Sequence, residues 1–180
     1  MRSRTALASL LTAAAIVFSV VATATPATAS ALDMTCIGSQ TSTFNPALTL
    51  TPQPVTVSAS TQYGPCTSTS VPALTAGSRS ATISYPSRSC RDLLDSASLI
   101  FTINWNTGQQ STISGNTTAS VVGAALVVTI TGNVTAGLFT GDSVISTVTG
   151  PATDITLCTA GLGSVSSIYS LVTLEITSLP

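Results

Sequence analysis

The sequence has no histidine and no lysine, and only 6% of its 180 residues are charged. Beyond residue 31 the only cations are Arg79, Arg88 and Arg91. So few positive charges cannot neutralise a row of phosphates, which argues against a nucleic-acid partner. Without histidine or lysine, the Ser-His-Asp and Cys-His arrangements of nucleophilic enzymes cannot be built. We therefore expect a protein that is not an enzyme.

Aromatic residues and long hydrophobic runs are also scarce. One Trp, three Tyr and four Phe are too few for the aromatic girdles of an envelope β-barrel pore. The longest apolar run beyond residue 31 covers residues 121–130 and is interrupted by Gly123 and Thr129. A membrane-spanning helix needs roughly 20 apolar residues. We therefore expect no transmembrane segment in the mature chain.

Residues 1–31 have the three parts of a secretory signal peptide. Two arginines lie in the first four residues, residues 6–22 are apolar, and Ala-x-Ala sites end at Ala29 and Ala31. A retained membrane anchor is the alternative, but the apolar stretch is shorter than the roughly 20 residues that a spanning helix needs. We predict cleavage after Ala31, with Ala29 as the alternative, and secretion to the cell exterior.

Residues 32–180 have the length of one domain. Three arginines against five aspartates and one glutamate give this part a net charge of 3 − 6 = −3. Its solubility must therefore come from Ser, Thr, Asn and Gln. Because Thr and Val fit a pleated sheet, the composition favours a single β-rich domain.

The four cysteines, Cys36, Cys66, Cys90 and Cys158, all lie in the mature part. An even number in an exported chain predicts two disulfides. A metal site is the competing interpretation, but there is no C-x-x-C pair and no histidine to complete it, so we expect no metal and no cofactor. Three connectivities are possible. We favour Cys36–Cys66 with Cys90–Cys158, which would fasten the first strands and tie the centre of the chain to its last third.

Alternation with a period of two marks the centre of the chain. Leu99, Phe101, Ile103 and Trp105 point one way, and the polar residues between them point the other, as in a half-buried strand. Residues 106–108 and 122–125 have the composition of turns. The pattern therefore predicts three consecutive antiparallel strands between residues 97 and 135.

The spacing of Cys90, Trp105 and Cys158 is compatible with the Cys…Trp…Cys pattern of immunoglobulin domains. The tyrosine of that pattern is absent, since Thr156 occupies its position. We predict an all-β fold, an antiparallel two-sheet sandwich with immunoglobulin-like or Greek-key topology, stapled by two disulfides. Trp105 is expected in its core, and Phe139 is expected to plug one end.

Most of the mature charges lie between residues 79 and 95, which suggests a candidate recognition patch of Arg88, Arg91, Asp92 and Asp95. The alternative is a solvated connector in which these residues pair locally. Ser89, three residues before Asp92, fits a cap on one helical turn.

Carboxylate pairs are the one enzymatic alternative. Asp92 with Asp95, or Asp142 with Asp154, would supply the two carboxylates of a glycoside hydrolase. No other feature of the sequence indicates a glycoside hydrolase.

Several local features resemble small secreted proteins of actinomycetes, especially streptomycetes. They are the early Cys36, the strand ending at residues 103–106, the glycine-flanked turn at residues 137–142, and Gly150-Pro151 before Cys158. The resemblance covers essentially the whole mature chain. It implies a source and a compartment but no activity and no functional residues.

The sequence therefore predicts a secreted, non-catalytic binding or surface-associated module. We expect its partner to be a protein or glycan at the cell exterior, bound through the loops at residues 67–78, 88–95 or 138–142. Self-association is a further expectation, because the sheet edges carry few charges. The alternatives are the carboxylate-dependent hydrolase and an envelope β-barrel or self-assembling structural protein.

Overall fold

The computed structural model describes residues 31–178, so nearly all of the predicted signal peptide lies outside the described residues. This part of the chain is all-β, with two short helices, η1 (Arg91–Leu94, a 3-10 helix) and α1 (Thr153–Thr159). Neither is long and apolar enough to cross a membrane. The eight strands are β1 (Ala31–Leu48), β2 (Gln53–Ser68), β3 (Gly77–Arg88), β4 (Ala97–Trp105), β5 (Gln110–Val122), β6 (Ala125–Gly137), β7 (Ser143–Pro151) and β8 (Val165–Ser178).

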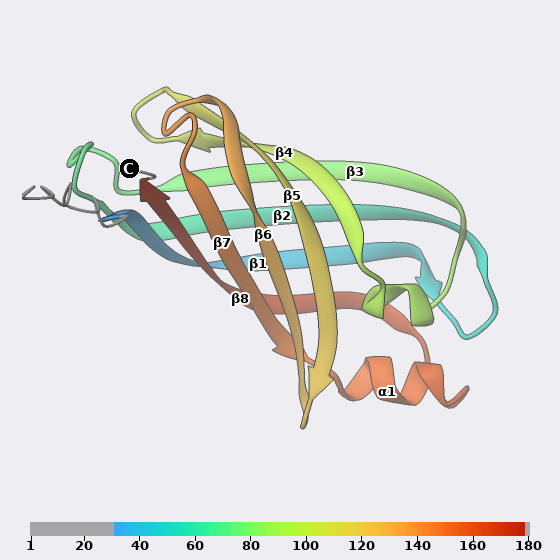
Figure 1. Cartoon of the computed structure of the whole chain (residues 1–180). Helices are drawn as coiled ribbons and strands as arrows, with labels where there is room; N and C mark the ends of the chain where they lie inside the picture. The colour runs from blue at the N-terminus through green and yellow to red at the C-terminus, as the bar shows by residue number, and fades with distance from the viewer. Residues whose placement is uncertain (1–30, 179–180) are drawn as a thin grey trace, which may run out of the picture.

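The strands form one closed antiparallel barrel in which each pairs with the next and β8 returns to β1 (Figure 1). The predicted two-sheet sandwich is therefore wrong. The three strands predicted between residues 97 and 135 are confirmed as β4, β5 and β6. They belong to an up-and-down meander that runs through the whole barrel, in place of an immunoglobulin-like or Greek-key order.

Closure comes from the first and last strands. β1 and β8 pair from Ala31 opposite Ser178 to Leu48 opposite Val165. Along β8, every second side chain from residue 168 to residue 176 is buried, while Tyr169 is exposed on the outer surface. One buried and one exposed face per strand is what a barrel requires, but a sandwich strand shows the same alternation.

A β-bulge lies between β1 and β2, where Cys36 pairs with Cys66 but Gly38 pairs with Tyr63. The extra residue in β2 reverses the alternation of the strand. As a result, Cys66 and Tyr63 both point into the barrel and are buried. The Cys36–Cys66 disulfide joins the two strands at this place, with a Cα–Cα distance of 4.1 Å.

Trp105 is the centre of the larger of two hydrophobic clusters, which we call the Trp105 core. Its indole Nε1 donates a hydrogen bond to Ser111 Oγ at 2.8 Å, and its ring meets Phe139 edge-on at a centroid distance of 6.4 Å. Trp105 and Phe139 are both buried, as predicted. The other members are Met34, Cys36, Tyr63, Cys66, Leu74, Ile103, Ile113, Val134, Val144, Val148, Val172, Leu174 and Ile176.

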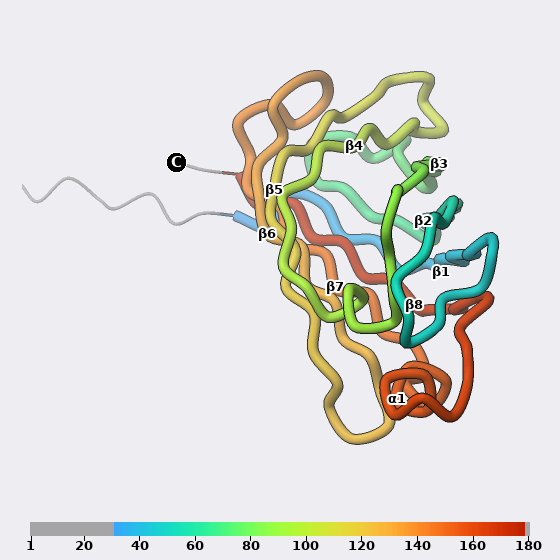
Figure 2. The backbone as a smooth tube through the Cα atoms, turned by 90° about the vertical axis from the view of Figure 1, so that its right-hand side faces the viewer, coloured from blue at the N-terminus to red at the C-terminus, as the bar shows by residue number. Residues whose placement is uncertain are grey.

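α1 lies at the end of the barrel where β8 begins (Figures 1 and 2). Its buried residues Ile155 and Cys158 belong to the second hydrophobic cluster, which we call the α1 core. It contains the Cys90–Cys158 disulfide, which links the segment before η1 to α1 and confirms the expected connectivity. Trp105 does not pack on this disulfide, so the resemblance to the immunoglobulin pattern is wrong in its packing as well as its topology. The other members are Phe44, Leu48, Val55, Leu126, Ala152, Val165 and Ile168.

The barrel wall is weakest between β3 and β4. These strands pair only through Gly77 with Trp105 and Ser78 with Asn104. Gly77 lies flat against the indole, since a Cβ there would come within 2.5 Å of the Trp105 ring. Beyond this contact β4 bends toward η1 while β3 continues straight (Figure 1). The wall is therefore closed at the Trp105 core and open on one side near the α1 core.

Candidate functional site

The open side of the barrel leads to two connected spaces. The outer one, which we call the side cleft, has a volume of about 750 Å³ between β3 and β4. The inner one, the inner chamber, has a volume of about 210 Å³ inside the barrel. Arg79 and Leu99 line both spaces. The cleft and the chamber therefore meet at these two side chains.

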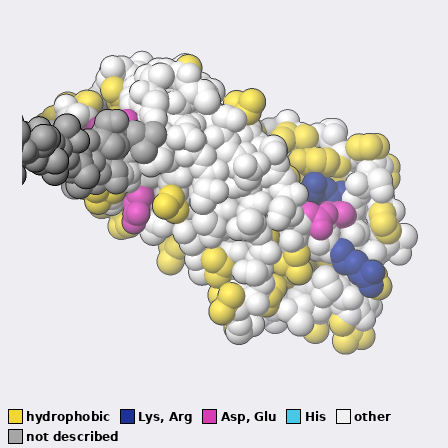
Figure 3. All heavy atoms as spheres, viewed as in Figure 1, with side chains coloured by type: hydrophobic (Ala, Val, Ile, Leu, Met, Phe, Trp, Pro, Cys, Tyr) yellow, Lys and Arg dark blue, Asp and Glu magenta, His cyan; other side chains and the backbone are white. Residues whose placement is uncertain are grey.

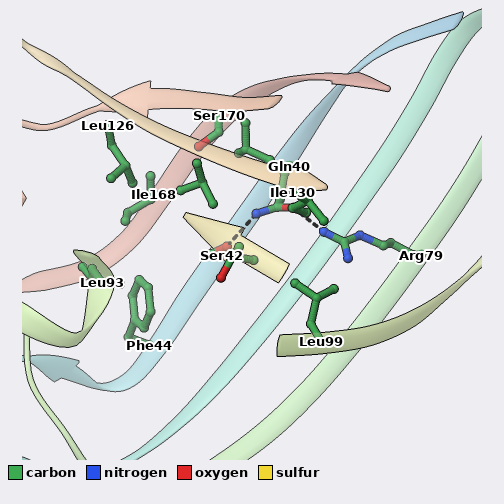
Figure 4. A pocket seen from close by; sticks show the side chains of 13 residues that line it. Gln40, Ser42, Phe44, Arg79, Leu93, Leu99, Leu126, Ile130, Ile168 and Ser170 are labelled. Atoms are coloured by element: carbon green, nitrogen blue, oxygen red, sulfur yellow. Dashed lines mark hydrogen bonds between the residues drawn. The ribbon is translucent and has the colours of Figure 1, made fainter. Parts of the chain in front are cut away.

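Apolar side chains from both cores form most of the inner chamber (Figure 4). The polar members lie where the barrel interior changes from one core to the other. The lining residues are Gln40, Ser42, Phe44, Arg79, Leu93, Leu99, Thr117, Leu126, Val128, Ile130, Val148, Ile168 and Ser170.

The side cleft exposes inward-facing residues of β3 and β4 that a complete wall would cover. Ile83 is 50% exposed for this reason, although it belongs to the inward-facing set of β3. On the right of the face shown in Figure 3, basic and acidic side chains lie next to each other, with hydrophobic side chains around them. The cleft is lined by Ala59, Arg79, Ser80, Ala81, Ile83, Leu99, Ile100, Phe101, Thr102, Asn104 and Gln110.

Arg79 is held in place by a neutral network. Its Nε donates to Thr61 Oγ1 at 3.2 Å, and its Nη2 donates to Gln40 Oε1 at 3.0 Å. Thr61 also donates to Gln40, and Gln40 donates to Ser42 Oγ at 3.3 Å. The guanidinium carbon lies 4.2 Å from the centroid of the Phe101 ring, a cation–π contact. These contacts fix both the position and the plane of the guanidinium.

No carboxylate in residues 31–178 forms an ion pair with Arg79. The nearby Tyr63 does not supply a negative charge. Burial raises the pKa of its phenol, and this effect outweighs the Arg79 guanidinium, which acts in the opposite direction. The phenol therefore stays neutral at neutral pH, and the positive charge of Arg79 is uncompensated at the junction of cleft and chamber.

The structure brings two members of the predicted recognition patch together. Arg88 stacks on Tyr85, at 4.3 Å from the ring centroid, and its Nη2 donates to the Asp92 carbonyl oxygen at 3.3 Å. Its Nε is buried without a hydrogen-bond partner in the described part of the chain. The Arg88 side chain thus links the end of β3 to η1.

The carboxylate of Asp92 is hydrogen-bonded to Ser89, while η1 begins after Cys90 without a side-chain cap, so the predicted cap by Ser89 is wrong. Asp92 Oδ2 accepts the backbone N–H of Ser89 at 2.5 Å and the Ser89 hydroxyl at 2.9 Å. The Ser89 backbone bond is the main cause of a pKa below the usual range for Asp92. Arg91 and Asp95 are exposed. This arrangement agrees with local pairing, and recognition by the patch stays a prediction.

The two carboxylate pairs considered for hydrolysis have different geometries. Asp142 and Asp154 lie beyond opposite ends of β7, whose nine residues at about 3.3 Å each separate them by roughly 30 Å. That distance exceeds the roughly 5–10 Å of glycosidase carboxylates. Asp92 and Asp95 are close along η1, but the Asp92 carboxylate already accepts two hydrogen bonds from Ser89.

Sequence reasoning missed the side cleft and the role of Arg79. One signal was available, because Arg79 shares its strand face with Ala81, Ile83 and Tyr85. A charged residue at the start of an apolar face predicts a polar place inside the barrel. The separation of β3 from β4 has no such signal, since β4 alternates as regularly as any paired strand.

Comparisons with known proteins give no family for this chain. No family matches it, and no curated protein or solved structure does so either. The resemblance to secreted proteins of actinomycetes stays a prediction.

Proposed function

We propose that the mature chain is a secreted, non-catalytic binding module that takes up a small, largely apolar ligand through the side cleft. The ligand would occupy the inner chamber and cover the exposed inward faces of β3 and β4. The observation that carries this proposal is the opening of an otherwise closed barrel at one place only in residues 31–178, with apolar side chains behind it.

The size and lining of the two spaces support a small molecule. Apolar cavities of about 150 Å³ already bind a molecule such as benzene. The inner chamber has about 210 Å³, and the side cleft adds room at its entrance. Ligand sites are typically apolar spaces with a few placed polar groups. The inner chamber has this composition, with Arg79 and Gln40 as the placed groups.

The aromatic side chains support this ligand over the glycan of our sequence-based expectation. Glycan sites expose flat aromatic rings, but Trp105 and Tyr63 are buried in the barrel. Tyr85 is partly buried and lies against the Arg88 guanidinium. Tyr169 is 60% exposed but stands on the outer surface of β8. The barrel interior is therefore the better-equipped site.

Two further features support a secreted binder that performs no chemistry. Both disulfides fit an oxidising compartment, and no free cysteine exists in the described chain. The spaces between β3 and β4 contain one charged side chain, Arg79, and no carboxylate. An acid–base pair cannot be assembled there.

Binding of the neutral dye Nile red tests the proposal. We expect its fluorescence to rise and to saturate at one dye per folded chain. Leu99→Trp should abolish the rise, because the larger side chain fills the junction of cleft and chamber. Ile145→Trp is the matched control, since Ile145 is 50% exposed on β7, away from both spaces.

Both variants should first melt cooperatively, which shows that they are folded. Absence of dye binding by the wild type would overturn the proposal. Equal binding by the wild type and Leu99→Trp would place the dye elsewhere and would also contradict it.

A further inference from the structure

We propose, on the basis of the proposed function above, that the ligand is an amphipathic monocarboxylic acid whose carboxylate binds Arg79 and whose chain lies in the inner chamber. The proposal rests on one fixed, uncompensated guanidinium at the entrance of an apolar space. It assigns the chemical class of the ligand, which the shape of the barrel alone does not.

The guanidinium has donors available for an anion. Arginine carries five N–H donors. Thr61 and Gln40 accept two of them, and the Tyr63 phenol is a third neutral partner. The donors that remain form part of the planar fork that pairs with both oxygens of a carboxylate. Because Phe101 and Gln40 hold the plane, little freedom is lost when the anion binds.

Charge favours an anion with a single negative charge. A partly buried charge without a counter-ion is unfavourable, because it has lost water and gained no opposite charge. Arg79 is half-buried, and its protein partners are neutral. An incoming carboxylate would supply the missing charge. A phosphate dianion would need a second cation, and neither space has one among the described residues.

The direction of the ligand follows from the two sides of the chamber. In Figure 4, Arg79 lies at one side, while Phe44, Leu93 and Ile168 lie across the chamber from it. A ligand with its carboxylate on Arg79 would therefore extend its chain toward the α1 core. Leu93 belongs to η1, so the disulfide-tied connector would form one wall around that chain.

The test compares head groups on one chain length. Octanoate, octanol and octylamine share the same apolar chain and carry a negative, a neutral and a positive head at pH 7. Calorimetric titration of the wild type should give octanoate an affinity at least about tenfold above that of octanol, as expected for a charge-assisted hydrogen-bonded pair. Octylamine should bind most weakly, because Arg79 repels it.

Substitutions of arginine test whether Arg79 causes the preference for octanoate over octanol. Arg79→Gln should bind octanoate and octanol equally, since the amide keeps a polar contact and lacks the charge. Arg91→Gln is the matched control, because it removes the same charge from an exposed position on η1. It should keep the preference for octanoate. Arg79→Lys keeps the charge without the fork and should show a smaller preference.

The outcomes separate this proposal from the function on which it rests. Equal binding of octanoate and octanol by the wild type would overturn the role of Arg79 and leave an apolar binding site. A preference that survives in Arg79→Gln would overturn it as well. If neither octanoate nor octanol binds, and Nile red does not bind either, both proposals fail. If Arg79→Gln does not fold, the comparison of octanoate with octanol on the wild type still tests whether a negative head group is preferred.

Discussion

The two ends of the barrel differ in how they are closed. At the Trp105 core, all eight strands are linked by hydrogen bonds, and buried rings fill the interior. At the α1 core, β3 and β4 have separated, and Leu93 of η1 lines the inner chamber behind the opening. The second disulfide joins the segment before η1 to α1. A covalent link therefore holds the chain together where the strand ladder does not.

The interior composition differs in the same way. The Trp105 core is dominated by large apolar and aromatic side chains, with the buried indole hydrogen-bonded to Ser111. Toward the α1 core, Gln40, Thr61 and Arg79 share the interior with apolar residues. Polar groups inside a barrel add little stability, but they give a ligand something to recognise. We infer that the Trp105 core provides most of the stability, and that the end near the α1 core provides the opening through which a ligand enters.

The largest effect should follow from removing the disulfide of the open end. Cys90→Ala with Cys158→Ala releases a loop with a sequence separation of 68 residues. The chain-entropy model gives about 4.4 kcal/mol for a loop of this length. Cys36→Ala with Cys66→Ala releases a separation of 30 residues, for which the model gives about 3.6 kcal/mol. Urea unfolding of both double variants measures the difference.

The order of the two losses is the informative result. If Cys36→Ala with Cys66→Ala loses more free energy of unfolding than Cys90→Ala with Cys158→Ala, packing in the Trp105 core outweighs loop length. The open end would then depend on its disulfide less than we infer. Circular dichroism should confirm that each double variant retains its sheet before the free energies are compared.

Trp105→Ala should lower the free energy of unfolding by about 4 kcal/mol, slightly less than loss of the Cys90–Cys158 disulfide. The substitution leaves a cavity and removes the hydrogen bond to Ser111. Phe101→Ala is the matched change on the same strand, where the edge of the Trp105 core faces the side cleft. Its ring is only partly buried, so the loss should be roughly half as large or smaller. Chemical denaturation measures both. Equal losses would mean that the edge of the core facing the side cleft is packed as firmly as its centre.

Sequence patterns predicted the strands better than their arrangement. Period-two alternation located β4, β5 and β6, and the same alternation placed Trp105 inside. The even number of cysteines predicted two disulfides, and the favoured connectivity is confirmed. Alternation depends on neighbouring residues in the chain, and the number of cysteines can be counted in the sequence.

The barrel itself was beyond those patterns. Its closure depends on the pairing of β1 with β8, whose ends, Ala31 and Ser178, are 147 residues apart. Inward and outward residues alternate equally in a sandwich strand, so the alternation does not select a partner. The side cleft is still harder to predict from the sequence, because it exists where β3 and β4 do not form hydrogen bonds with each other. Only Arg79, a charge on an apolar strand face, pointed toward it.

The smallest effect concerns acid, and it compares the carboxylates of the two ends. Asp92 lies in η1 at the open end, and hydrogen bonds from Ser89 lower its pKa from the ordinary value of 3.8. Burial would raise the pKa of Asp33, near the Trp105 core, but hydrogen bonds from Ser70 and its neighbours outweigh burial and lower it. In both cases the folded state favours the charged carboxylate.

A lowered pKa gives stability that is fully present above about pH 4 and is lost as the pH falls through the folded value. Asp92→Asn and Asp33→Asn should each be less stable than the wild type at pH 7, by less than about 1 kcal/mol, because both groups are partly exposed and screened. Each variant should also lose less stability than the wild type between pH 5 and pH 2.5. Urea unfolding at several pH values measures this. If only Asp92→Asn also weakens Nile red binding, the hydrogen bonds between Ser89 and Asp92 support the chamber wall. An unchanged pH profile in Asp92→Asn would mean that the Ser89 bonds do not hold the connector in solution.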